Sequence, residues 1–308
     1  MSETTPVAAR AISFKVDVDT HDGMKNGVPR LLDLFAKHRV TATFFLSFGP
    51  DNAGKAILQI FTKRGFLKKM LRTNAPGLYG WRTILSGTLL PARPIAAAFP
   101  DLVHRIREAG HEVAVHAWDH RFWQDHLAQM SEAQITEQFI QSFRAFETIL
   151  GVKPLAVAAP GWQLTAKSLK VQDRLELTYA SDLRNGSPVF PELDGYTATT
   201  LQIPTTTRCL EELLAAGLRD EASWEREFLA DLRLEPHPVF PLHTEVEGGP
   251  FADCFDRFLP KLLAQFPRTV TLHDYATTIL AGQNNRPAVR PVKLIEIPGR
   301  GGLVPSCG

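Results

Sequence analysis

The sequence predicts an α/β protein built around a mainly parallel sheet, either closed into a barrel or left open. Strand-like and helix-like segments alternate seven or eight times along the 308 residues, without a sequence repeat of about 20–50 residues. Polar residues gather where the strands end, and the active sites of α/β barrels lie at that edge. No GxGxxG follows the first strand and no P-loop is present, which disfavours a nucleotide-binding protein.

The expected strands are runs rich in apolar, β-branched and aromatic residues. They span residues 11–18, 40–46, 111–115, 154–159, 175–180, 200–203, 239–242 and 269–272. Helices are expected between and after them, over residues 29–38, 101–109, 131–150, from about 166, 209–216, 223–234 and 255–266. Several ends carry local signals: Pro29 starts the first helix, Gly110 and Gly151 end the second and third, and Ser131 with Gln134 forms a capping box.

The composition is that of an ordinary globular protein, with 44% hydrophobic residues, 22% charged residues and a net charge of +1. Three widely separated cysteines form no CxxC pair, so we expect a reducing compartment and neither a disulfide framework nor a thiolate metal site. The polar first ten residues lack the apolar core of a signal peptide, and no run of about 18 apolar residues exists. We therefore expect a cytoplasmic protein without a transmembrane helix.

Two pairs of polar residues at strand ends make a candidate metal site. Asp17 and Asp19 end the first strand, and His116 and His120 follow the third. Two histidines four apart lie on one face of a helical turn, so both imidazoles are expected to reach one ion. We predict that Asp19, His116 and His120 hold one divalent metal ion with positions open for water and substrate. Zn²⁺, Mn²⁺ and Co²⁺ all suit this ligand set.

The remaining strand-end residues suit proton transfer. Asp17 lies two residues from Asp19, on the same face of the strand, so it is placed to accept a proton from metal-bound water. His243 ends a distant strand and would approach from the opposite side to protonate a leaving nitrogen. Base, activated water and acid together describe hydrolysis of an amide or ester. Capping or loop acids and a satisfied core histidine are the alternatives.

The order of these motifs resembles the polysaccharide deacetylase superfamily. The resemblance covers about residues 11–280 and rests on Asp-x-Asp after strand one, HxxxH after strand three, a Pro-Gly turn after strand four and a late strand-end histidine. It implies a distorted (β/α)7-type barrel that removes N- or O-acyl groups from sugars, with Asp17 as the base and His243 as the acid. The superfamily commonly orients this base with an arginine in the turn after strand four. Ala158 and Ala159 stand before Pro160 here, so Arg184 is the candidate replacement.

Further motifs are similar to one branch of that superfamily, deformylases of a 4-formamido sugar carried on undecaprenyl phosphate. They include Gly49-Pro50-Asp51-Asn52, Leu78-Tyr79-Gly80-Trp81 and His243-Thr244-Glu245-Val246-Glu247-Gly248. The resemblance implies a linear-amide hydrolase of lipid A biosynthesis and polymyxin resistance, acting at the cytoplasmic face of the inner membrane. The side chains predicted to contact the substrate are Trp118, Trp162, Asp182, Arg184 and Glu245. The alternative functions are an N-deacetylase of another N-acyl sugar or polysaccharide, and a non-catalytic barrel that binds lipid-linked sugar. The alternative role of the two tryptophans is packing.

We expect residues 1–281 to form one domain with a basic insertion at about 50–100, and residues 282–308 to form a Gly- and Pro-rich tail across the surface. Residues 51–100 contain eight basic residues and one acidic residue, interleaved with apolar ones. This pattern is typical of a segment on an anionic bilayer, where each Lys or Arg contributes about 1 kcal/mol. The predicted membrane-surface residues are Lys63, Arg64, Lys68, Lys69 and Arg72. A solvated helix or a nucleic-acid patch is the alternative, and we expect no nucleic-acid partner.

Overall fold

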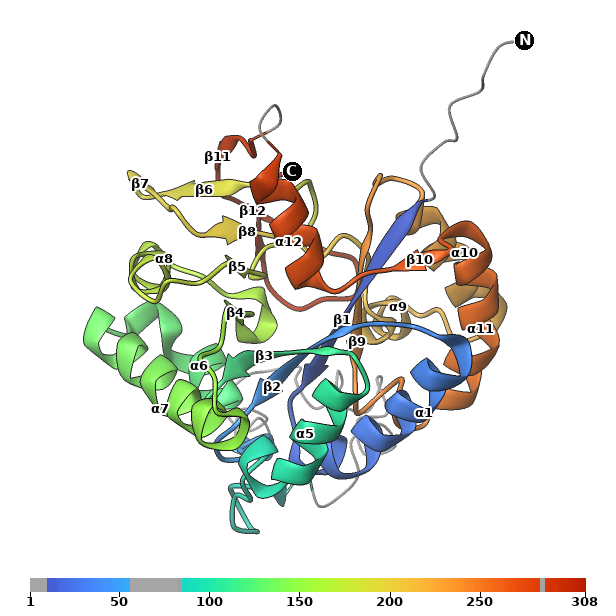
Figure 1. The fold of residues 1–308 in the computed structure, drawn as a ribbon, viewed down its shortest axis with the longest axis horizontal. Coiled ribbons are helices and arrows are strands. Elements are labelled where there is room, and N and C mark those ends of the chain that lie inside the picture. The colour runs from blue at the N-terminus through green and yellow to red at the C-terminus, as the bar shows by residue number, and fades with distance from the viewer. Residues whose placement is uncertain (1–9, 56–82, 84, 283–285) are drawn as a thin grey trace.

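The computed structural model describes residues 10–55, 83, 85–282 and 286–308. Its centre is a parallel sheet ordered β10-β1-β2-β3-β4-β5-β8, with β9 also paired to β1 (Figure 1). These strands are β1 (Ala11–Val18), β2 (Thr43–Ser47), β3 (Glu112–Ala117), β4 (Ala156–Val157), β5 (Tyr179–Ala180), β8 (Leu201–Gln202), β9 (Val239–His243) and β10 (Arg268–Thr269). β10 pairs with the start of β1 and β9 with the rest of it. The predicted α/β barrel-type fold is confirmed.

The barrel has a seam between β8 and β9, which no strand ladder joins in the part of the chain that the structure describes. Thr206 spans this seam. Its N–H donates to the Val239 carbonyl at 3.1 Å, and its hydroxyl accepts from the Val239 N–H at 2.9 Å. The sheet is therefore an incomplete barrel, in keeping with the distorted form that was expected.

Alternation along β1 separates two layers of side chains. Phe14 and Val16 belong to the large core between the strands and the helices. Lys15 and Asp17 point the other way, into the barrel, where Lys15 Nζ lies 5.1 Å from the centroid of the Phe45 ring. The apolar part of this inner layer includes Phe45, Ala114, Ala156, Ala158, Tyr179 and Leu201. A polar site can therefore form inside the barrel without interrupting the outer core.

Helices cover the outside of the sheet, and Figure 1 shows α1, α5, α7 and α11 arranged around it. The helices are α1 (Val28–His38), α5 (Pro100–Glu108), α6 (His120–His126), α7 (Glu132–Leu150), α8 (Ala166–Asp173), α9 (Leu210–Ala215), α10 (Glu221–Leu232), α11 (Ala252–Gln265) and α12 (Leu272–Ala281). Shorter turns are η1 (Gly23–Gly27), η2 (Ala96–Ala98), η3 (Leu127–Gln129) and η4 (Pro160–Trp162). The capping box of Ser131 and Gln134 is confirmed, and α7 ends at Gly151 with φ 69°.

The last predicted strand is partly wrong. β10 ends at Thr269, and Thr271 instead caps α12, its hydroxyl accepting from the Asp274 N–H at 3.1 Å. The cap satisfies a backbone donor at the helix start, which a continued strand would not do. Helix α6 and the short pair β6 (Phe190–Leu193) and β7 (Tyr196–Thr197) were not predicted.

The tail is partly internal, so the prediction that it crosses the surface is wrong for its last residues. β11 (Val289–Pro291) pairs with β6, and β12 (Lys293–Ile295) pairs with β13 (Val304–Ser306), which is buried. The Arg184 N–H donates to the Pro305 carbonyl at 2.9 Å. Among the described residues, no helix is both long and apolar enough to cross a bilayer. The predicted membrane-surface residues lie outside the described residues: Lys63, Arg64, Lys68, Lys69 and Arg72.

Candidate metal and catalytic site

Three elements bring Asp19, His116 and His120 together at the carboxyl ends of the strands. Asp19 follows β1, His116 lies in β3 and His120 begins α6. The two imidazole centroids are 5.2 Å apart. The expectation that both histidines share one helical turn is wrong, because strand becomes helix between them. Asp119 makes that change by capping α6, where it accepts from the Phe122 N–H at 2.9 Å.

The donor atoms of these three residues are spaced as one ion requires. Asp19 Oδ1 lies 3.3 Å from His116 Nε2, and Asp19 Oδ2 lies 3.3 Å from His120 Nε2. Ligands at about 2.0–2.1 Å from a tetrahedral ion are themselves about 3.3 Å apart. His116 Nδ1 bonds to the Ala158 carbonyl at 2.8 Å, which leaves Nε2 as the free acceptor. Asp19 Oδ1 is buried without a hydrogen-bond partner in the described chain. The set therefore fits a divalent metal ion.

Glu245 supports the loop that carries Asp19. Its Oε1 accepts from the Asp19 N–H at 3.2 Å, and from the Thr20 N–H and hydroxyl at 2.9 and 2.6 Å. Burial, and then the Asp19 carboxylate, raise the pKa of Glu245 to about 7. Burial alone would raise the pKa of Asp19 as well, but His120 and His116 hold it well below its usual range. Asp19 is therefore the more readily ionised carboxyl of the two, and substrate contact by Glu245 stays a prediction.

Asp17 lies beside Lys15, a residue that the sequence interpretation missed. Lys15 Nζ contacts Asp17 Oδ2 directly, and both side chains are buried. Asp17 Oδ1 has no hydrogen-bond partner among the described residues. One carboxylate oxygen is thus tethered while the other is free to accept a proton. The two-residue alternation of β1 places both side chains on one face, and this signal could have identified Lys15.

Arg184 does not orient Asp17, contrary to expectation. Its guanidinium is fully buried and donates to both Glu212 carboxylate oxygens, at 2.9 and 3.0 Å. Asp182 is also fully buried and accepts from the Gln172 amide at 2.7 Å. Both side chains therefore brace the strand ends, and their complete burial argues against the predicted contact with a sugar.

His243 ends β9 and is the register partner of Asp17 on β1. The two candidate proton-transfer residues are thus neighbours on adjacent strands. The approach of His243 from the side opposite Asp17 stays a prediction. His243 Nδ1 lies 3.0 Å from a Glu211 carboxylate oxygen. Burial alone would lower the pKa of His243, but Glu211 raises it well above its usual range. Glu211 therefore favours the protonated imidazole that a general acid needs.

The two tryptophans predicted at the site differ in exposure. Trp162 is buried, and its Nε1 donates to Thr205 Oγ1 at 2.9 Å, an arrangement that favours packing for this residue. Trp118 is half-buried, and Gly49 lies so close that an added Cβ would be 2.7 Å from its indole. The absence of a side chain at Gly49 therefore lets the indole lie against the backbone there. Sugar contact by either tryptophan stays a prediction.

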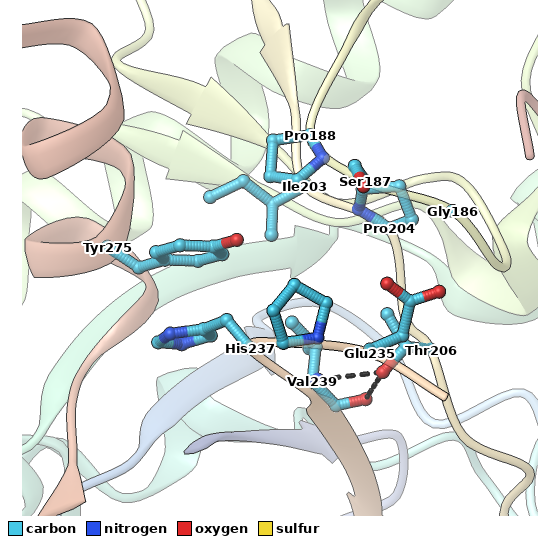
Figure 2. A pocket seen from close by; sticks show the side chains of 11 residues that line it. Gly186, Ser187, Pro188, Ile203, Pro204, Thr206, Glu235, His237, Val239 and Tyr275 are labelled. Atoms are coloured by element: carbon cyan, nitrogen blue, oxygen red, sulfur yellow. Dashed lines mark hydrogen bonds between the residues drawn. The ribbon is translucent and has the colours of Figure 1, made fainter. Parts of the chain in front are cut away.

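A separate surface hollow lies away from this site (Figure 2). It is lined in part by His237 and Tyr275, whose rings stack 3.6 Å apart. His237 Nε2 is hydrogen-bonded to Ser13 Oγ at 3.0 Å. Ser13 precedes Asp17 by four residues on β1, a distance of about 13 Å at about 3.3 Å per residue. The hollow therefore lies at the opposite end of the strand and contains none of the metal-site residues.

The chain is similar in sequence and fold to known proteins. The family model of polysaccharide deacetylase matches residues 15–180. A Shewanella sediminis (strain HAW-EB3) protein, named as a probable 4-deoxy-4-formamido-L-arabinose-phosphoundecaprenol deformylase (ArnD), is 34% identical over 249 residues, or 80% of each chain. A protein of Wigglesworthia glossinidia brevipalpis with the same name is 29% identical over 240 residues, 77% of this chain and 82% of its own.

Solved structures share the fold. A Mycobacterium smegmatis crystal structure assigned to the polysaccharide deacetylases superposes with a TM-score of 0.63 at 19% identity, over 95% of this chain and 96% of its own. The xylanase-linked domain Xyl-CE4, from the hindgut metagenome of Trinervitermes trinervoides, superposes with a TM-score of 0.51 at 12% identity, over 91% of this chain and 96% of its own. Sequence and fold agree, and the chain belongs to the polysaccharide deacetylase family.

Proposed function

We propose that the chain is a metal-dependent hydrolase that removes the formyl group from a 4-formamido sugar linked to undecaprenyl phosphate. The observation that carries the chemistry is the in-register placement of Asp17 and His243 beside the three-residue set of Asp19, His116 and His120. The substrate follows from two relatives named as deformylases of this lipid-linked sugar, which match most of the chain.

The residues divide the work of amide hydrolysis. Asp19, His116 and His120 would hold Zn²⁺, Mn²⁺ or Co²⁺, and such an ion lowers the pKa of water to about 7 and polarises a carbonyl. Asp17 accepts the proton of the attacking water on the oxygen that Lys15 leaves free. His243, whose protonated form Glu211 favours, gives its proton to the leaving nitrogen.

The reaction balances as a hydrolysis. The water oxygen bonds to the formyl carbon, the C–N bond breaks, and the nitrogen receives the proton of His243, giving formate and a free amino sugar. That amine is cationic at neutral pH, so its transfer to lipid A would reduce the negative charge of the membrane surface that lipid A forms. On this ground we place the reaction in lipid A modification and polymyxin resistance.

A lipid-linked substrate requires an enzyme that works at a membrane surface. We propose peripheral binding at the cytoplasmic face of the inner membrane. The support is the sequence of the basic insertion, which carries eight basic residues and one acidic residue over positions 51–100 and would be attracted to anionic lipid.

The test measures formate release from the undecaprenyl-linked 4-formamido sugar and identifies the lipid product by mass spectrometry. The corresponding N-acetyl sugar is assayed in parallel. Asp17→Asn and His243→Ala are expected to keep bound metal yet lose most turnover, because each removes one proton transfer. Preferential cleavage of the N-acetyl sugar would favour an N-deacetylase. Binding of the lipid with no hydrolysis of either sugar would favour a non-catalytic barrel.

A further inference from the structure

Trp162 contacts both halves of the proposed proton-transfer machinery. Its ring centroid lies 5.2 Å from Lys15 Nζ, the cation that holds Asp17. It also lies 6.3 Å from the centroid of the His243 ring, with the two planes at 90°. A shift of this indole would therefore disturb the base, through Lys15, and the acid together.

The backbone of Trp162 needs an external restraint to hold this position. Its φ is 54°, a left-handed conformation that a bulky side chain keeps only where its surroundings enforce it. Gly161, which precedes it, also has a positive φ of 63°. Gly161 adopts this conformation readily because it has no Cβ, so the unfavourable residue of the turn is Trp162.

Arg184, whose Cζ lies 4.4 Å from the centroid of the Trp162 ring, and the hydrogen bond to Thr205 hold the indole from within the barrel. Arg300, in the C-terminal tail, adds the restraint that also reaches the backbone of the turn. Its Nη2 donates to the Gly161 carbonyl at 2.8 Å, and its Cζ lies 4.8 Å from the centroid of the Trp162 ring. Its Nη1 donates to Glu212 Oε1 at 3.3 Å, and Glu212 is itself held by the buried Arg184. A guanidinium that stacks on an indole and bonds to the preceding carbonyl restrains both the position and the tilt of the ring.

We propose that Arg300 is a positioning residue of the active site, and that the C-terminal tail is required for turnover because it holds Trp162 against Lys15 and His243. This inference rests on the proposed function, since it assigns Arg300 an effect on the acid and the base named there. Arg300 is not a catalytic residue: it acts through Trp162, and its side chain is 20% exposed at the edge of the site.

The tail offers a matched pair of glycines to test the docking. Gly299 and Gly302 have almost the same left-handed φ, 87° and 88°. A Cβ on Gly299 would lie 1.9 Å from the Glu212 carbonyl oxygen, whereas a Cβ on Gly302 would meet nothing within 4 Å. Both alanine variants carry the same backbone strain, but only Gly299→Ala would push the tail off α9. Gly299→Ala is therefore expected to lower kcat and Gly302→Ala to leave it unchanged.

The main experiment measures kcat, KM and bound metal for Arg300→Ala, with Arg290→Ala as the control because Arg290 is an exposed arginine of the same tail. Arg300→Ala is expected to lower kcat by about 10²-fold with little change in KM or metal content, the scale of a misplaced catalytic group. Added guanidinium ion, at a concentration far below denaturing, is expected to restore several-fold of the loss. A wild-type kcat for Arg300→Ala, or a loss that guanidinium leaves unchanged, overturns the proposal.

A second measurement needs no substrate. Acrylamide quenching of Trp162 fluorescence, taken as the difference from Trp162→Phe, is expected to rise in Arg300→Ala and not in Arg290→Ala. A Trp162 that stays as shielded as in the wild type overturns the positioning role. If instead the wild-type protein hydrolyses no formamide while the quenching rises as expected, the proposed function has failed and the docking of the tail stands.

Discussion

Replacing Lys15 with methionine tests the internal geometry of the site directly. Lys15 and Asp17 are 0% and 3% exposed, so a methionine of similar length removes the ammonium and leaves the Asp17 charge unpaired inside the barrel. Removing one partner of a buried ion pair destabilises a protein by about 3–5 kcal/mol. The double variant Lys15→Met with Asp17→Asn carries neither charge, so it is expected to recover most of that loss.

Urea unfolding gives the free energies, and formate release gives kcat. Lys15→Met is expected to lower kcat by about 10²-fold, because general-base catalysis contributes about 10²- to 10⁴-fold and the freed carboxylate loses its orientation. Lys15→Arg is expected to retain most activity, since its cation still reaches the same face. Ser13→Ala, at the preceding inward position of β1, is the control and should leave kcat unchanged. Equal stability of the single and double variants, or full kcat in Lys15→Met, would refute the assignment of Lys15 to the base.

The other predictions concern the metal, pH and the membrane. His116→Ala and His120→Ala should each lose bound metal and nearly all activity but keep the fold, because both residues lie at the mouth of the barrel; metal analysis showing full occupancy would exclude them as ligands. Stability should fall between about pH 6.5 and 4, because burial lowers the pKa of His111 from 6.5 to about 4. The folded state keeps His111 neutral, with Nδ1 accepting the Ala42 N–H at 3.2 Å, whereas the unfolded chain protonates it. This stability is therefore complete above the unfolded pKa and is lost below it. His111→Gln should flatten that part of the urea-unfolding profile, and an unchanged slope would contradict the account. The last change replaces four basic residues of the insertion with Glu: Lys63, Arg64, Lys68 and Lys69. It should release the protein from anionic vesicles and lower activity on lipid-embedded substrate, but not on a short-chain analogue. Equal losses on both substrates would count against membrane binding.

Local sequence rules were enough to place much of the framework. The strand at residues 11–18, the capping box of α7 and the glycine that ends α7 are determined by neighbours within a few residues, and all three are as predicted. The spacing of Asp17 with Asp19 put both at the end of one strand for the same reason. The alternation of side chains along a strand also places Lys15 on the same face as Asp17, two residues earlier, so Lys15 could have been predicted as well.

The tertiary structure decided which distant residues complete the site. Glu211, and not a sequence neighbour, holds His243, and Glu245 reaches across 225 residues to the Thr20 N–H. Arg184 was placed near the base by sequence order but turns to Glu212 instead. Arg300 reaches the Gly161 carbonyl from 139 residues away. Local periodicity fixes which face of an element a side chain occupies, because the backbone repeat sets it. Which partner that face meets depends on how the strands curl into a barrel and how the tail packs back on it, and no short-range pattern encodes that.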